Sequence, residues 1–193
     1  MTMERGYLLI LISAGISALS ALGMINFAFG GYLLIAAGLH YLPTAAKELR
    51  TAAKFTYITL ALSLGFTLFE RILPSIFVFN PYVSSFGYII YLFFSVGIFF
   101  WLLKAEYIWS PHARKRMDLL IYSGVALIYL LLNTFNVLSW LHIDLLMFNL
   151  NMGVNFFRIS DFIDILYHSV LIFILAKLYL EARQNGSGLK RWN

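Results

Sequence analysis

Three ionisable side chains lie close together near the C-terminal end of the sequence: Asp161, Asp164 and His168. At 100° per residue, these positions fall within one narrow face of an α-helix. The helix that they begin is apolar enough to cross a bilayer, and carboxylates and imidazoles that enter hydrocarbon need partners or a water-filled cavity. We therefore expect this face to point into the protein. It would form either a site for a ligand, ion or proton, or a network of structural contacts between helices.

The same residue types could also hold a metal ion, because aspartate and histidine are usual ligands of zinc, manganese and iron. The spacing D-x-x-D-x-x-x-H of Asp161, Asp164 and His168 suits a divalent metal, and His40 is expected at a depth close to that of His168. Two histidines at equal depth on different helices could bind one haem between them. Such a match also arises easily by chance, so haem is not expected.

Polar stripes on two other predicted helices could meet this face, because steps of three and four residues keep side chains on one side of a helix. The first stripe contains Thr59, Ser63, Thr67 and Glu70. The second contains Asp118, Tyr122, Tyr129, Asn133 and Asn136. From the whole set, we expect the ligand-binding residues to be Asp161, Asp164, His168, Glu70, Asn133 and Asn136.

The pocket that these side chains would form has an excess of negative charge. The half of the protein that would contain this pocket is expected to hold four carboxylates, those of Glu70, Asp144, Asp161 and Asp164. The two basic residues expected there are Arg71 and Arg158. Four carboxylates against two guanidinium groups leave two uncompensated negative charges, so a pocket of this kind would attract cations.

The composition indicates an integral membrane protein. The chain is 61% hydrophobic and only 12% charged, with a mean hydropathy of +0.82, whereas a soluble domain carries about a quarter charged residues. The sequence has no cysteine, which excludes disulfides, thiolate metal sites and a cysteine nucleophile. The net charge of +5 indicates basic loops near anionic lipid, and we expect no nucleic-acid partner.

The apolar runs predict an all-α fold with six transmembrane helices in a single domain over residues 1–193, because a bilayer core requires about 20 apolar residues per span. The predicted spans are residues 7–25, 31–46, 55–79, 86–103, 119–140 and 160–181. The second span is short and contains Pro43, so a re-entrant helix would suit it equally. The mixed segment 141–158 is expected to form an interfacial helix or a lid before the last span.

The distribution of basic residues predicts the orientation of these spans. Six spans place 12 of the 14 Lys and Arg residues on one side: Arg5, Lys47, Arg50, Lys54, Lys104, Arg114, Lys115, Arg116, Lys177, Arg183, Lys190 and Arg191. Only Arg71 and Arg158 lie on the other side. Basic residues concentrate in cytoplasmic loops, so both termini are expected in the cytoplasm, and the plasma membrane is the expected location.

Three functions are compatible with these features. The first and preferred one is binding or transport of a small molecule or cation through a polar pocket in the outer half of the bundle. The second is an intramembrane metal-dependent enzyme that acts on a lipid-like substrate with a metal-activated water. The third is an accessory subunit, in a homo-oligomer or a larger membrane complex, that docks through the small residues Ser13, Ser17 and Ala21. No G-x-S-x-G, H-E-x-x-H or glycine-rich phosphate motif is present.

Overall fold

The computed structural model describes residues 3–21, 28–42, 46–72, 81–109, 113–140 and 153–184. Within these ranges, all regular secondary structure is α-helical, which confirms the predicted all-α fold with six helices. The helices are α1 (Met3–Ala21), α2 (Ala28–His40), α3 (Lys47–Ile72), α5 (Pro81–Trp109), α6 (Ala113–Trp140) and α7 (Gly153–Gln184).

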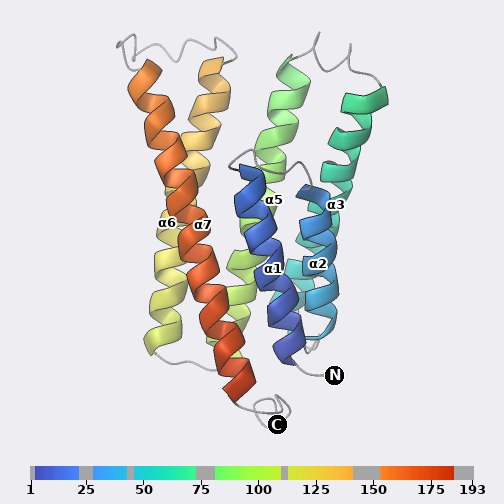
Figure 1. Ribbon diagram of the computed structural model, residues 1–193, viewed down its shortest axis with the longest axis vertical. Helices are drawn as coiled ribbons and strands as arrows, with labels where there is room; N and C mark the ends of the chain where they lie inside the picture. Colours follow the sequence, from blue (N-terminus) through green and yellow to red (C-terminus); the bar gives the residue numbers. More distant parts are fainter. Residues whose placement is uncertain are drawn as a thin grey trace.

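The six helices form a closed ring. Each helix packs mainly against the next one along the chain, and α7 completes the ring by packing against α1. Consecutive helices run in opposite directions, so both chain ends lie at the same end of the bundle (Figure 1). Helices α1, α3 and α6 therefore start at the same end of the bundle at which α2, α5 and α7 finish.

Helices α1 and α2 form a hairpin that is shorter than the rest of the bundle. They contain 19 and 13 residues, or about 28 and 20 Å of helix, whereas the 32 residues of α7 extend about 48 Å. Their backbones touch near the chain ends, where a Cβ atom on Gly38 would lie 2.7 Å from the carbonyl oxygen of Gly6. The hairpin therefore lines the half of the bundle that contains the termini, and α3, α5, α6 and α7 continue beyond it (Figure 1).

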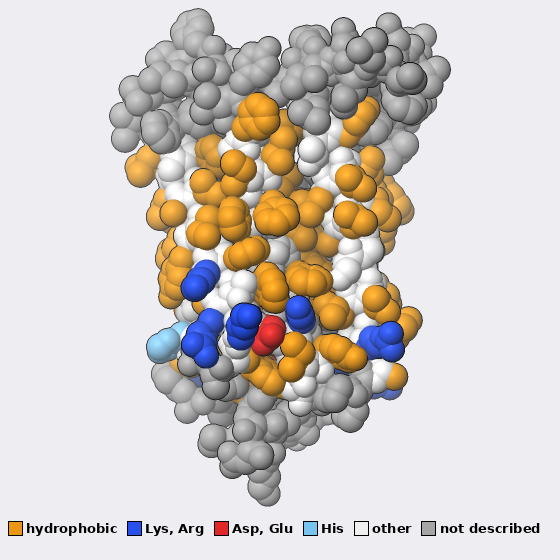
Figure 2. All heavy atoms as spheres, turned by 180° about the vertical axis from the view of Figure 1, so that it is seen from behind, with side chains coloured by type: hydrophobic (Ala, Val, Ile, Leu, Met, Phe, Trp, Pro, Cys, Tyr) orange, Lys and Arg blue, Asp and Glu red, His pale blue; other side chains and the backbone are white. Residues whose placement is uncertain are grey.

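Most of the described Lys and Arg residues gather at the end of the bundle that contains the termini, which we call the basic end (Figure 2). They lie in the first turns of α1, α3 and α6 and in the last turns of α5 and α7, whereas Arg71, near the end of α3, and Arg158, near the start of α7, belong to the opposite end. The opposite end, where α3 and α6 finish and α5 and α7 begin, is called the far end. This one-sided distribution agrees with the charge asymmetry of the sequence.

Four helices are long and apolar enough to cross a membrane, in the segments Met3–Ser20, Phe86–Trp109, Ala113–Val137 and Asp161–Gln184. Helix α2 adds a shorter apolar stretch, Phe29–His40. Large apolar side chains also cover the outer surface (Figure 2); Phe173, for example, is 70% exposed. An apolar exterior is unfavourable in water, so these helices indicate a membrane protein.

Several predicted boundaries change. The helix predicted at residues 31–46 ends at His40, and the one predicted to end at residue 103 continues to Trp109. Residues 153–158 of the predicted interfacial segment 141–158 are helical and continuous with the rest of α7. Residues 141–152 and both Pro43 and Pro74 lie outside the described residues.

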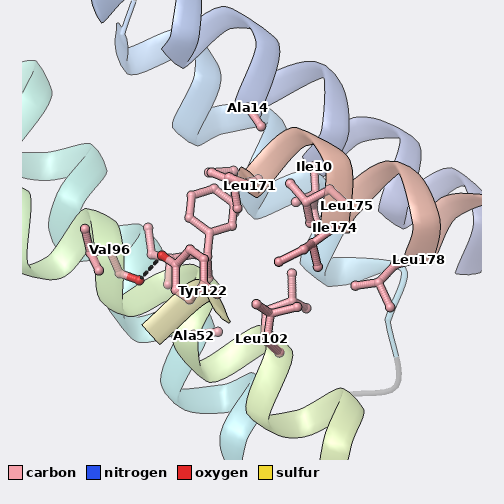
Figure 3. Close-up of a cluster of buried hydrophobic side chains, with 14 of the residues drawn as sticks. Ile10, Ala14, Ala52, Val96, Leu102, Tyr122, Leu171, Ile174, Leu175 and Leu178 are labelled. Atoms are coloured by element: carbon pink, nitrogen blue, oxygen red, sulfur yellow. Dashed lines mark hydrogen bonds between the residues drawn. The ribbon is translucent and has the colours of Figure 1, made fainter. Parts of the chain in front are cut away.

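The basic half of the bundle has an apolar core between α1, α5 and α7. Ile10, Leu102, Leu171 and Leu175 are almost completely buried there and point toward one another (Figure 3). Buried apolar residues recur at steps of three and four along these helices, for example Tyr7, Ile10 and Ala14 in α1, so each helix presents one continuous apolar face. The result is a packed apolar layer between the basic end and the polar residues of α6 and α7 described next.

Candidate functional site

A buried amide on α6 holds the carboxylate of Asp164 on α7. The Nδ2 atom of Asn133 donates one hydrogen bond to Oδ1 of Asp164, at 3.0 Å, and another to the backbone carbonyl of Tyr129, at 3.1 Å. Both hydrogens of the amide are therefore used. This contact joins the predicted polar face of α7 to the predicted polar stripe of α6.

His168 lies one helical turn after Asp164 and is 8% exposed. Its Nδ1 atom is 2.8 Å from the backbone carbonyl oxygen of Asp164. A carbonyl oxygen can only accept, so Nδ1 must carry the hydrogen, and in the neutral ring Nε2 is an acceptor. The hydrogen bond therefore fixes both the tautomer and the orientation of the imidazole.

Tyrosine rings surround this imidazole and carboxylate. The ring of Tyr129 meets the ring of His168 edge to face, with 6.2 Å between centroids. Tyr88, on α5, lies within electrostatic range of both Asp164 and Tyr129. Three helices thus contribute to one group of side chains, which we call the Asp164 site: Tyr88, Tyr129, Asn133, Asp164 and His168.

A chain of tyrosines supports the site from the side of the apolar layer. Tyr167 stacks on Tyr129 with 4.2 Å between ring centroids, and its hydroxyl is 3.1 Å from that of Tyr122. The hydroxyl of Tyr122 donates to the carbonyl of Val96, at 2.8 Å (Figure 3), so Tyr167 must be the donor to Tyr122. These contacts join α5, α6 and α7 and fix the ring of Tyr129.

The other predicted ligand-binding residues lie outside this group. Asp161 is exposed, one turn nearer the far end, and Asn136 is half-buried. Asp161 interacts electrostatically with Asp164, but neither residue has a hydrogen bond to the Asp164 site among the described residues. Glu70 lies in the last turn of α3, and its side chain is outside the described part of the structure. The structure therefore brings together Asn133, Asp164 and His168 from the predicted set.

His40 does not accompany His168, and the prediction of equal depth is wrong. His40 is exposed at the last position of α2, two residues after the contact between Gly38 and Gly6 at the basic end. The prediction failed because the α1–α2 hairpin lines only the basic half of the bundle. Within the described ranges, no three His, Asp or Glu side chains form a group that could hold a metal ion.

A second polar group, which sequence reasoning missed, lies at the basic end. Glu106 on α5 accepts hydrogen bonds from Lys115 on α6 and from the hydroxyl of Tyr7 on α1. Glu106 and Lys115 are only 3% and 6% exposed, and the Nζ atom of Lys115 is 3.9 Å from Glu181 on α7. We call Tyr7, Glu106, Lys115 and Glu181 the ionic cluster; beside it, Lys177 pairs with Asp118.

The missed cluster has a recognisable signal in the sequence. Glu106 follows Leu102 by four residues and Leu103 by three, so it continues the apolar face of α5. The sequence reasoning assigned residues 104–116 to a connection, and this placed both Glu106 and Lys115 in solvent. Extending the helix by two turns instead carries Glu106 into the bundle.

The two polar groups differ in what they can do chemically. In the ionic cluster, the buried carboxylate of Glu106 is paired directly with a cation, the ammonium group of Lys115. In the Asp164 site, the carboxylate has only the neutral amide of Asn133 as a hydrogen-bond partner among the described residues. The Asp164 site is therefore the one whose chemistry calls for a further positive or hydrogen-bond-donating group.

Comparison with known proteins assigns no family to the chain. No family model, no curated protein and no solved structure matches it.

Proposed function

We propose that this chain is an integral protein of the plasma membrane that binds or transports a small molecule or cation through the Asp164 site. The basic end would face the cytoplasm, because Lys and Arg residues concentrate on that side of membrane proteins. Both termini would then be cytoplasmic, and the Asp164 site would lie in the outer half of the bundle.

The proposal rests mainly on one observation, which is that the carboxylate of Asp164 has the amide of Asn133 as its hydrogen-bond partner. A carboxylate inside a membrane is costly unless it meets a positive charge, a hydrogen-bond network or water. Asp164 is half-buried in a helix apolar enough to span, and its hydrogen-bond partner is a neutral amide. A bound cation or a donor-bearing small molecule would supply the missing compensation.

The layers of the interior support access from the outer side. Asp161, one turn nearer the far end than Asp164, is exposed, which places one edge of the Asp164 site near the surface at that end of the bundle. On the opposite side, the apolar layer around Leu171 and then the ionic cluster separate the site from the cytoplasm. Transport would require these two layers to open, with the ionic cluster separating as α7 moves away from α5 and α6.

The two alternatives have less in their favour. A metal-dependent enzyme would need a third ligand beside Asp164 and His168, and the described residues offer no such group. An accessory subunit would need its small-residue face exposed, but Ser13 is completely buried. Its Oγ would lie 3.6 Å from a Cβ atom on Gly31 of the same chain.

The test is a binding screen on the purified chain with the variant Asp164→Asn. Small cations and small polar molecules are added singly, and binding is read from the rise in unfolding temperature, which follows from ligand affinity for the folded state. We expect at least one solute to stabilise the wild-type chain and to lose about tenfold or more in affinity with Asp164→Asn. The control is Asp161→Asn, an exposed carboxylate on the same helix. Equal responses of the two variants would contradict the proposal.

A further inference from the structure

Three polar atoms of the Asp164 site lack a hydrogen-bond partner within the described part of the chain. They are the hydroxyl of Tyr129, the Oδ2 atom of Asp164 and the Nε2 atom of His168. Tyr129 and His168 are each only 8% exposed. Among the described residues, the one fully buried side-chain oxygen or nitrogen without a partner is Oγ of Ser13. The three acceptor atoms are therefore not sealed inside the protein, and a bound molecule can reach them.

These three atoms are all able to accept hydrogen bonds. The carboxylate of Asp164 can only accept hydrogen bonds. The neutral ring of His168 carries its hydrogen on Nδ1, so its Nε2 atom accepts as well. The amide of Asn133 directs both of its hydrogens to oxygen atoms of the protein. Among the described groups of the site, only phenolic hydroxyls therefore retain a hydrogen to donate, and an anion would find few partners.

The positions of these atoms follow from two contacts across the interface between α6 and α7. Asn133 faces Asp164 at one level, and Tyr129 faces His168 one turn closer to the basic end. Because Tyr129 and His168 lie one turn from Asn133 and Asp164 respectively, the three free acceptors belong to adjacent levels of the same interface. Tyr88, on α5, lies within electrostatic range of this interface.

From this arrangement, we propose that the Asp164 site binds a primary organic ammonium ion with an apolar or aromatic body. An ammonium group carries one positive charge and three N–H donors, which match three free acceptors of which one is a carboxylate oxygen. The rings of Tyr88 and Tyr129 supply aromatic surface for the cation and for the attached body. This inference rests on the proposed function and specifies its ligand class.

Other cations fit the same atoms less well. A quaternary ammonium ion has no N–H group, so it would leave all three acceptors without partners. A divalent metal ion prefers several carboxylate or imidazole ligands, and the described residues bring no three such side chains together. The site should therefore discriminate by the number of N–H donors and not by charge alone.

The test compares three probes of similar size on the full chain in detergent micelles at one neutral pH. The probes are 2-phenylethylammonium, its trimethylated quaternary analogue and the neutral alcohol 2-phenylethanol, with affinities measured by calorimetry. We expect the primary ammonium ion to bind about tenfold or more tightly than either analogue, because each lost charge-assisted contact weakens binding substantially. Equal affinity for the primary and quaternary ions, or for the ammonium ion and the alcohol, would overturn the inference.

Variants identify the atoms responsible. Asp164→Asn and His168→Phe should each weaken binding of 2-phenylethylammonium about tenfold or more, whereas Asp161→Asn should change it less than about twofold. Tyr129→Phe keeps the ring that stacks on Tyr167 and removes only a hydroxyl without a partner among the described residues. It should therefore leave the unliganded unfolding temperature unchanged and still weaken binding severalfold. Unchanged binding in a folded Tyr129→Phe variant would contradict the inference.

The screen described above separates failure of this inference from failure of the proposed function. If 2-phenylethylammonium does not bind but another solute binds in a manner that depends on Asp164, the ammonium assignment is wrong and the proposed function stands. If no solute binds in a manner that depends on Asp164, both are wrong.

Discussion

At the scale of single residues, the main feature is the carboxylate of Asp164, because only one of its two oxygens has a hydrogen-bond partner among the described residues. Asp164 receives one hydrogen bond from a buried neutral amide, and the neighbouring imidazole turns an acceptor toward the same interface. Helical spacing was enough to predict that Asp164 and His168 share a face. It could not predict that Asp161 would be exposed, because the orientation of a helix depends on its neighbours.

Asn133 should have a measurable effect on stability through this contact. In Asn133→Leu, the carboxylate loses its amide donor, so we expect the free energy of unfolding to fall by about 1–2 kcal/mol. Asn136→Leu is the matched control, because Asn136 lies on the same helix and has no hydrogen bond among the described residues. Unfolding in mixed detergent micelles measures both. Equal losses in the two variants would show that the contact between Asn133 and Asp164 is not formed.

At the scale of helices, the sequence predicted the number and type of elements better than their ends. The apolar runs gave six helices, but α5 continues through Glu106 and α7 begins at Gly153. The extension of α5 carries the carboxylate of Glu106 into the interior, where a buried charge requires contacts with partner groups. Tyr7 and Lys115 supply those contacts to Glu106, and they come from helices far away in the chain.

The ionic cluster should be important for the stability of this end of the bundle. Lys115→Met leaves the buried carboxylate of Glu106 without its cation, so we expect a loss of about 3 kcal/mol or more in the free energy of unfolding. The double variant Glu106→Leu with Lys115→Met removes both charges and should recover part of this loss. Arg116→Met is the control, since Arg116 is exposed, and it should change stability by less than about 0.5 kcal/mol. A double variant as unstable as Lys115→Met would contradict a buried ion pair.

At the scale of the whole molecule, the closed ring and the short α1–α2 hairpin could not be predicted from the sequence. Both depend on contacts between distant segments, such as the touching backbones of Gly6 and Gly38. The hairpin lines the basic half (Figure 1), and along α7 the Asp164 site lies nearer the far end than the buried Leu171 and Leu175. In the proposed orientation, this arrangement gives a site reached from outside the cell and closed toward the cytoplasm.

Reactivity of a single cysteine at the site tests this arrangement most directly, since the natural chain has no cysteine. A water-soluble, membrane-impermeant thiol reagent is added to intact cells that express Asp164→Cys, Leu171→Cys or Ile165→Cys. Leu171 lies in the apolar layer, and Ile165 is exposed on the apolar exterior that would face lipid. Our account predicts that the external reagent modifies the thiol at position 164 and leaves the thiols at positions 171 and 165 unmodified. If position 164 reacts only from the cytoplasmic side, or not at all, the Asp164 site is not an outward-facing pocket.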